Sequence, residues 1–281
     1  MKPYKTEPLF VKKIWGEEIW HTGVSPEESL VLIKFIEAKD ILSVQIHPSD
    51  EYAARVEGRP RGKDEMWLIV ECEQDAEIVY GFNGGISKKE LRKLIQNNTL
   101  VEGLNFIKVK RGDCVFIPAG TVHTLGKGIT VLEIQQSCDL TYRLYDWDRR
   151  DGYGRKRELH IEKALDAINY SNTLPRIKNI YDSSVDYPTD IIKCEHFSCI
   201  YRPMKHKDKY TYNGGCFRAV TLIEGKGLIT FENQVITMEK GDTCIFPENY
   251  RGETGIECVE DMECIETICD FHLIVDNATD K

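Results

Sequence analysis

The sequence predicts a mainly β protein with a few helices, organised as two small β-barrels in tandem. Short apolar runs with strand character dominate the chain, glycine-containing turns separate them, and one turn-strand motif occurs twice. A chain of 281 residues can form one large domain or two of ordinary size. Either arrangement would bury a core without the help of disulfide bonds.

The strands are expected to be short and closely spaced. Turns such as Asn83-Gly84-Gly85, Arg111-Gly112-Asp113 and Gly126-Lys127-Gly128 separate them, as is typical of a β-sandwich or barrel. In the first half, the runs with strand character are Leu30 to Ile36, Ile41 to Ile46, Met66 to Val70, Glu77 to Phe82, Phe106 to Val109, Val115 to Ile117 and Ile129 to Ile134. Further runs begin at Ile191, Phe217, Leu228 and Val235.

Two helical patterns interrupt the strands. Ser87 is expected to cap the first helix, because Glu90 stands where a capping box requires an acidic residue and apolar residues then recur on one face. This helix forms a short insertion near residues 87–98. The second helix is predicted from about Glu158 to Tyr170, again from apolar residues at helical spacing.

An internal repeat indicates two related barrels. The segment Lys110 to Pro118 resembles Glu239 to Pro247 in residue type and spacing. Five residues beyond each proline stand His123 in the first copy and Gly252 in the second, so we expect only the first barrel to bind a metal. The predicted domains are a metal-binding catalytic barrel at 1–157, a helix and linker at 158–188, and a metal-free barrel at 189–281.

Composition limits the function classes. A net charge of -9 argues against general nucleic-acid binding, although an anionic small substrate remains possible where cations are placed locally. No apolar run is long enough to cross a bilayer, and the first residues lack a secretory signal, so we expect a cytoplasmic protein without a membrane partner. The ten cysteines are scattered, with no Cys-x-x-Cys pair, and are expected to be buried thiols. A monomer and a homodimer both remain open.

Four residues form a candidate metal site: Gln45, His47, Glu65 and His123. Because side chains on a strand alternate, Gln45 and His47 are expected to point to the same face. Two imidazoles with a carboxylate suit zinc, iron, manganese or nickel, and an open coordination position would suit a catalytic ion.

The motifs around these residues resemble type I mannose-6-phosphate isomerases of the short bacterial kind, within the cupin superfamily. The resemblance is specific from near residue 10 to about 150 and looser beyond. The matching motifs are Lys13-Ile14-Trp15-Gly16, Gln45-x-His47-Pro48, Gly62-Lys63-x-Glu65-x-Trp67, Pro118-Ala119-Gly120-Thr121-Val122-His123, Glu133-Ile134-Gln135-Gln136-Ser137 and Thr141-Tyr142-Arg143-Leu144-Tyr145-Asp146.

The resemblance implies two cupin-like barrels and an enzyme that interconverts mannose 6-phosphate and fructose 6-phosphate through an enediolate. It also implies one zinc ion, held by the glutamine, the two histidines and the glutamate named above. The family's active-site arginine and lysine match Arg143 and Lys63. Longer relatives carry a helical insertion for which this chain has no room, so any phosphate-binding residues of that insertion cannot be carried over.

Several roles stay open. Arg143 could face the enediolate or the phosphate, or form a surface ion pair. Lys63 could hold a sugar hydroxyl, or transfer protons if burial and the zinc charge lower its pKa. Glu133 could act as an acid or base, or pair with an arginine. Ser43 and Arg149 are the candidate substrate-binding residues, Arg149 for the phosphate.

Two other functions fit a barrel of this kind. A cupin with iron could be a dioxygenase, since two histidines and a carboxylate also suit that chemistry. The glutamine and the nearby cations speak against it. A cupin that only binds a sugar is the second alternative, and turnover would distinguish it.

Overall fold

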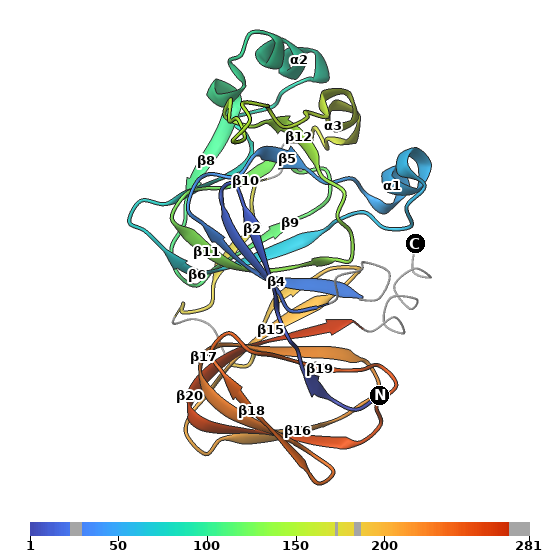
Figure 1. The fold of residues 1–281 in the computed structure, drawn as a ribbon, viewed down its shortest axis with the longest axis vertical. Helices are drawn as coiled ribbons and strands as arrows, with labels where there is room; N and C mark the ends of the chain where they lie inside the picture. Colours follow the sequence, from blue (N-terminus) through green and yellow to red (C-terminus); the bar gives the residue numbers. More distant parts are fainter. Residues whose placement is uncertain (23–29, 172–173, 183–186, 270–281) are drawn as a thin grey trace. The chain divides into compact units, whose positions relative to one another are not determined.

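The computed structural model describes residues 1–22, 30–171, 174–182 and 187–269 (Figure 1). The chain forms two compact units, one of residues Leu9–Asn179 and one that combines Met1–Pro8 with Ile180–Lys281. Both are built from antiparallel strands, which confirms the mainly β prediction. The first eight residues belong to the second unit and not, as predicted, to the first, because strand β1 (Tyr4–Lys5) pairs with a strand of the second unit.

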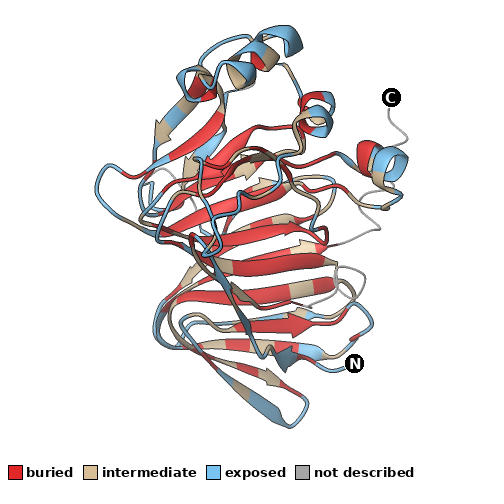
Figure 2. Ribbon diagram, turned by 45° about the horizontal axis from the view of Figure 1, so that its top comes forward, coloured by how far each residue is buried: buried red, intermediate tan, exposed pale blue. Residues whose placement is uncertain are grey.

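The first unit consists of two facing sheets. One sheet has the order β12-β5-β10-β7-β8, and the other has the order β13-β9-β6-β11-β4-β3-β2. Their strands are β2 (Leu9–Lys13), β3 (Gly16–Trp20), β4 (Val31–Ala38), β5 (Val44–Ile46), β6 (Glu65–Cys72), β7 (Glu77–Phe82), β8 (Leu104–Lys108), β9 (Asp113–Ile117), β10 (His123–Leu125), β11 (Ile129–Gln136), β12 (Tyr142–Tyr145) and β13 (Ile177–Asn179). Apolar side chains from both sheets form one buried cluster, and a second buried cluster packs the helical segments against the β12-β5-β10-β7-β8 sheet. Figure 2 shows that buried residues follow the strands of the unit.

The second unit is a single antiparallel sheet that contains two long strands. Its path is β1-β19-β17-β20-β15-β14, with β16 added beside β20 and β18 beside β17. The strands are β14 (Thr189–Lys193), β15 (Ser198–Met204), β16 (Lys209–Asn213), β17 (Phe217–Phe231), β18 (Gln234–Glu239), β19 (Thr243–Phe246) and β20 (Glu253–Cys269). Its core is again apolar and buried.

The helices belong to the first unit. Helix α2 (Lys88–Gln96) begins as predicted, because Ser87 and Glu90 form the reciprocal capping box. Helix α3 (Ile161–Ala167) is shorter than predicted, since Ile168 already adopts an extended conformation. The prediction missed helix α1 (Asp50–Glu57), although Ser49 caps it and Gly58 ends it with φ of 64°. A short 3-10 helix covers Leu100–Gly103.

The predicted repeat has the same local structure in both copies. In each, a glycine with positive φ, 88° at Gly112 and 90° at Gly241, precedes an aspartate that begins the turn into a strand. Asp113 accepts a hydrogen bond from the backbone N–H of Lys110, and Asp242 accepts one from that of Glu239. The two motifs therefore fold alike.

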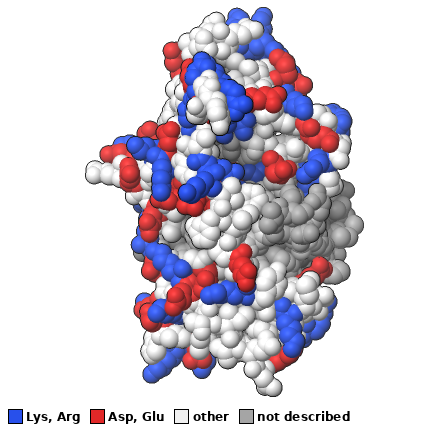
Figure 3. Space-filling view, in the orientation of Figure 1, with Lys and Arg blue, Asp and Glu red and all other residues white. Residues whose placement is uncertain are grey.

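In the part of the chain that the structure describes, no helix is long and apolar enough to cross a membrane. On the face drawn in Figure 3, Lys and Arg side chains lie among Asp and Glu side chains. All ten cysteines are free thiols, and most of them are buried, as expected from their scattered positions.

Candidate functional site

The candidate metal site lies between the two sheets of the first barrel. His123 on β10 faces Gln45 on β5 across one sheet, and Glu65 begins β6 in the other sheet. His47 directly follows β5. His47, Glu65 and His123 are buried, and one possible ligand atom of each lies within 4.8 Å of the others. The structure thus brings together residues that are up to 76 positions apart on the chain, from His47 to His123.

Backbone carbonyls orient both imidazoles. The Nδ1 atom of His47 lies 2.8 Å from the carbonyl oxygen of Leu140, and that of His123 lies 2.9 Å from the carbonyl of Thr121. A carbonyl can only accept, so each Nδ1 carries the proton and each Nε2 keeps a free lone pair. The two Nε2 atoms each lie 3.3 Å from an oxygen of Glu65. Such backbone contacts are how proteins orient metal-binding histidines.

Glu65 is the group that most clearly fits a cation. Its side chain is completely buried; Oε1 has no hydrogen-bond partner, and Oε2 lies 2.7 Å from the Lys63 ammonium group. Burial alone would raise the pKa of Glu65, but Lys63, His47 and His123 outweigh burial and hold it well below the usual value. The group is therefore ionised. Burial lowers the pKa of His123 to about 4 and also lowers that of His47, so both imidazoles are neutral ligands at pH 7.

Gln45 lies beside this cluster. Its amide nitrogen is 3.4 Å from His123 Nε2, and its amide oxygen accepts a hydrogen bond of 3.1 Å from Ser43. Turning the amide by 180° would present the oxygen to the position that His123 and Glu65 face, as a metal ligand requires. Ser43 is buried and lines the cavity described below.

Lys63 is buried and lies against the candidate ligands. Its Nζ lies 2.7 Å from Glu65 Oε2 and 3.2 Å from His47 Nε2. Burial alone would lower its pKa, as the sequence led us to expect, but the carboxylates of Glu65 and Glu133 outweigh burial and raise it. The condition under which Lys63 could transfer protons, a lowered pKa, is therefore not met among these residues.

Glu133 does not pair with an arginine. It pairs with Lys34, whose Nζ lies 2.5 Å from Oε1, and it accepts a hydrogen bond of 3.0 Å from Trp67 Nε1. These three residues stand side by side on β4, β11 and β6. The Trp67 ring also contacts His123 edge-on, at 5.5 Å between centroids. Lys34 carries no signal in the sequence, because strand register alone places it there.

A cavity of about 350 Å³ opens beside the cluster. It is large enough for a small polar ligand. Its polar lining comes from both sheets and includes Glu18, Lys34, Ser43, Gln45, Lys63, Glu133, Gln135, Asp139, Thr141, Arg143 and Arg157. The candidates Arg143, Lys63, Glu133, Ser43 and Gln45 therefore border one space.

Three arginines gather around Asp146 near this cavity. Arg149 and Arg157 both bind the Asp146 carboxylate, with Arg149 Nη2 at 2.6 Å and Arg157 Nε at 2.7 Å. Arg143 donates to the carbonyl of Glu158 at 2.9 Å and keeps a buried Nε without a partner. Burial and the charge of Arg157 lower the pKa of Arg143. Arg149 also lies 3.6 Å from the Asp40 carboxylate, so three guanidinium groups and two carboxylates leave one net positive charge.

The structure places Arg149 differently from the prediction. Arg149 donates to Asp146 and to the carbonyl of Ile41 at 2.5 Å, and it is not among the residues that line the cavity. Arg157, which the sequence analysis did not select, does line it. The ion pair of Arg143 with Asp139 or Asp146, considered as the alternative, is not among the contacts of the described residues.

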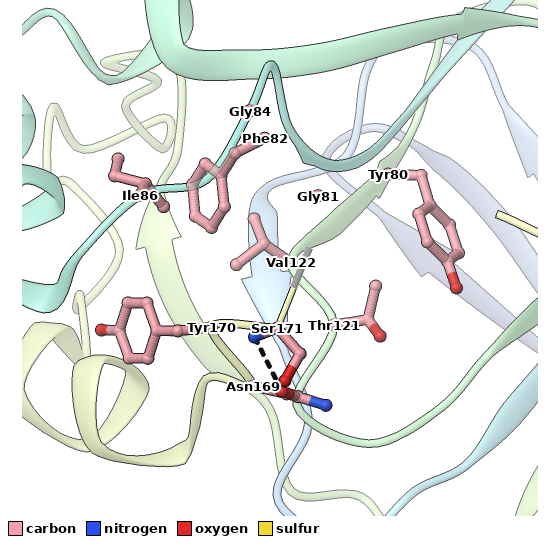
Figure 4. A pocket seen from close by; sticks show the side chains of 10 residues that line it. All are labelled: Tyr80, Gly81, Phe82, Gly84, Ile86, Thr121, Val122, Asn169, Tyr170 and Ser171. Carbon is pink, nitrogen blue, oxygen red and sulfur yellow. Dashed lines mark hydrogen bonds between the residues drawn. The ribbon is translucent and has the colours of Figure 1, made fainter. Parts of the chain in front are cut away.

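A second, smaller pocket borders Thr121 and Val122, the two residues that precede His123 (Figure 4). Tyr80, Phe82, Val122 and Tyr170 contribute to its lining, and Thr121, whose carbonyl orients His123, borders it. Its volume of about 20 Å³ holds roughly one water molecule. A space of this size cannot hold a sugar phosphate, so this pocket is not a candidate substrate site.

Comparison with known proteins identifies the family, although no family model matches the chain. Mannose-6-phosphate isomerase ManA of Bacillus subtilis is 37% identical over 241 residues, which span 82% of this chain and 73% of the relative. A crystal structure of the mannose 6-phosphate isomerase from Bacillus subtilis superimposes with a TM-score of 0.79 at 29% identity, covering 95% of this chain and 99% of the other. A zinc-bound mannose 6-phosphate isomerase shares the fold at 11% identity, with a TM-score of 0.69 over 96% of this chain and all of the other. The chain belongs to the mannose-6-phosphate isomerase family.

Proposed function

We propose that the protein interconverts mannose 6-phosphate and fructose 6-phosphate with one zinc ion in the first barrel. The observation that carries this proposal is the buried carboxylate of Glu65, whose Oε1 has no hydrogen-bond partner and which two imidazole Nε2 atoms face. The relatives named above support the activity. The zinc-bound neighbour supports the choice of metal.

The donor set fits such an ion. His47 and His123 would supply neutral nitrogens, Glu65 one negative charge, and Gln45 a neutral oxygen, so a divalent ion would keep net positive charge. When bound, zinc would stabilise negative charge on a sugar oxygen as a Lewis acid. Thiolate ligands play no part in this site, since none of the candidate ligands is a cysteine.

The residues of the chain would handle the proton and the intermediate. The reaction removes a proton from C2 of the aldose, passes through an enediolate and returns a proton at C1. Glu133 lines the cavity as a carboxylate held by Lys34 and Trp67, and we assign it the role of acid and base. Lys63, as an ammonium group, would hold a sugar hydroxyl.

The arginines would take the phosphate end. The group of Arg143, Arg149 and Arg157 with Asp146 and Asp40 keeps one net positive charge, and planar guanidinium groups suit the oxygens of a phosphate monoester. Arg143 and Arg157 reach the cavity and would contact the phosphate, whereas Arg149 would act by holding Asp146. Ser43 would contact the sugar.

Chelation tests the metal and the reaction together. A coupled isomerase assay before and after treatment with a chelator, and again after zinc is added back, should show activity lost and restored. Metal analysis of the untreated protein should give one zinc per chain. If the wild-type protein with zinc fails to interconvert the two sugar phosphates, the proposal is wrong. Iron in the protein with oxygen consumption would instead favour the dioxygenase.

Two variants separate the metal site from the arginines. His123→Ala should lose zinc and all turnover, because a ligand is missing. Arg143→Ala should keep zinc but lower kcat/KM by about 100-fold, since a charge-assisted contact worth about 1.5–3 kcal/mol is removed from a buried site. Zinc binding with full activity in Arg143→Ala would contradict the role given to Arg143.

A further inference from the structure

The second barrel contains a polar cluster, centred on a buried carboxylate, that the proposed reaction does not use. The carboxylate of Glu266 is fully buried at its centre. It accepts hydrogen bonds from Arg202 Nε at 2.5 Å, from the Tyr210 hydroxyl at 2.7 Å and from Arg218. We call these four residues, with Tyr212 and Thr254, the Arg218 cluster.

The cluster stands where the first barrel has its candidate metal site. Apart from β12 and β2, which have no counterpart, the strands of the two barrels follow the same order, with β16, β19 and β17 in the places of β5, β9 and β6. Glu65 lies opposite Ile117, the last residue of the repeated strand in the first copy. Arg218 lies opposite Phe246, the last residue of the repeated strand in the second copy. Arg218 therefore takes the place of Glu65.

The remaining positions correspond in the same way. His123 is the first residue of its strand to face β5, and Thr254 is the first inward-facing residue of β20 to face β16. Counting from the proline had placed Gly252 there instead, and strand pairing corrects this by two residues. The corresponding pairs are Gln45 with Tyr212, Glu65 with Arg218, His123 with Thr254, and Glu133 with Glu266.

The position of His47 has no side chain in the second barrel. It is two residues beyond Gln45, and the residue two beyond Tyr212 is Gly214. A Cβ atom on Gly214 would lie 2.1 Å from the carbonyl oxygen of Tyr250, so no imidazole fits. The site has lost both imidazoles and gained a guanidinium in place of a carboxylate. This change replaces a preference for a cation by a preference for an anion.

Three hydrogen-bond donors of the cluster are buried without a hydrogen bond of ordinary geometry. They are Arg218 Nε and the hydroxyls of Tyr212 and Thr254. Thr254 is completely buried. A contact between the two hydroxyls lowers the pKa of Tyr212, but this contact lacks the geometry of an ordinary hydrogen bond. Buried donors of this kind are normally satisfied, so their convergence indicates a missing acceptor.

The charges of the cluster also leave room for an anion. Arg202 and Arg218 carry two positive charges, and Glu266 carries one negative charge, so one positive charge remains. Stacking of Arg202 on Tyr210 at 4.2 Å and of Arg218 on Tyr212 at 4.5 Å compensates for only part of it. A monovalent anion would complete the balance.

We propose that the Arg218 cluster binds a small monovalent inorganic anion of the halide class, held by Arg218 Nε and the hydroxyls of Tyr212 and Thr254. The anion satisfies three buried donors and the surplus charge at once. The site is independent of the isomerase activity. It would fix the interior of the second barrel in the way that a metal would fix the first.

Diffraction from bromide-soaked crystals of the full chain tests the site directly. We expect an anomalous peak within hydrogen-bond distance of Arg218 Nε and the Thr254 hydroxyl. An ordered water at that position without bromide exchange, or no density at all, would overturn the proposal. This measurement uses the wild-type protein, so it does not depend on the folding of any variant.

Halide-dependent thermal stability provides the second test. At constant ionic strength, kept with a large organic anion, the Tm should rise with chloride concentration, because ligand binding to the folded state stabilises it. Thr254→Val and Tyr212→Phe should each weaken the apparent chloride affinity about tenfold, since each removes one hydrogen bond to a charged group.

Thr267→Val is the matched control. Thr267 lies on the same strand, is equally buried and has an unpartnered hydroxyl, but it follows Glu266 directly and points to the other face of the sheet. It should keep the wild-type response to chloride. An unchanged response in Thr254→Val and Tyr212→Phe, or an equal loss in Thr267→Val, would contradict the proposal.

Discussion

Each histidine of the candidate metal site uses one ring nitrogen for the backbone and leaves the other for a ligand. The carbonyls of Leu140 and Thr121 fix the Nδ1 protons, so the orientation of the rings does not depend on a bound ion. Glu133 is held in a similar manner by Lys34 and Trp67. At the scale of single residues, the site is therefore largely preorganised.

Trp67→Phe tests this preorganisation. Phenylalanine keeps an aromatic ring beside His123 but removes the hydrogen bond to Glu133 Oε2, which is 3.0 Å long. We expect kcat to fall about tenfold with zinc content unchanged, as for other residues that support an active group. The pKa of Glu133 should rise when it loses this donor, so the acidic limb of the kcat profile should move to higher pH.

The control for this experiment is Trp147→Phe. The Trp147 indole donates to the carbonyl of Leu42 at 2.6 Å and does not contact Glu133. This variant should keep the wild-type pH profile. A Trp67→Phe enzyme with unchanged kcat and an unchanged acidic limb would show that Trp67 only packs.

At the scale of elements, local signals predicted most of the strands and helix α2. Residues that follow one another in a motif, such as Gln45 with His47, could be selected from the sequence alone. Lys34 and Arg157 could not, because their places beside Glu133 and Asp146 depend on contacts between segments far apart in the chain. Helix α1 carried a recognisable signal in Ser49 and Gly58, which cap its two ends.

Gly62→Ala tests how helix α1 positions Lys63. The Gly62 N–H donates to Asp50 at 2.6 Å, and a Cβ at Gly62 would lie 2.3 Å from the carbonyl oxygen of Pro48. The loop must therefore move away from the start of the helix. We expect a loss of about 1–3 kcal/mol in the free energy of unfolding, measured with urea, together with reduced activity.

Gly85→Ala is the matched control for this change. A Cβ at Gly85 meets no atom within 4 Å, so its stability should change by less than about 0.5 kcal/mol. If Gly62→Ala were as stable and as active as this control, the close packing of the loop on helix α1 would have no energetic effect.

At the scale of the whole molecule, the two barrels share a topology but have different side chains in their interiors. The repeated Gly-Asp motif allowed both barrels to be predicted from the sequence, because it reports local turn geometry. The side chains that line the interior of each barrel could not be predicted in this way. Arg218 in the place of Glu65 is visible only when strand pairing defines which positions correspond.

Acid unfolding of the whole chain should depend on Asp146. Burial would raise the pKa of Asp146, but hydrogen bonds from Arg157 and Arg149 outweigh burial and lower it. A lowered pKa in the folded state contributes stability that is present above the pKa of the unfolded chain and is lost as the pH falls through the folded value. Asp146→Asn should therefore be less stable than the wild type at pH 7, and the difference should shrink below about pH 4. Urea unfolding at a series of pH values measures this difference in stability.

Asp151→Asn should show a smaller difference, because Asp151 pairs with Arg155 at the surface, where water screens the interaction. A constant difference between Asp146→Asn and the wild type from pH 7 to pH 3 would mean that the carboxylate acts through its shape rather than its charge.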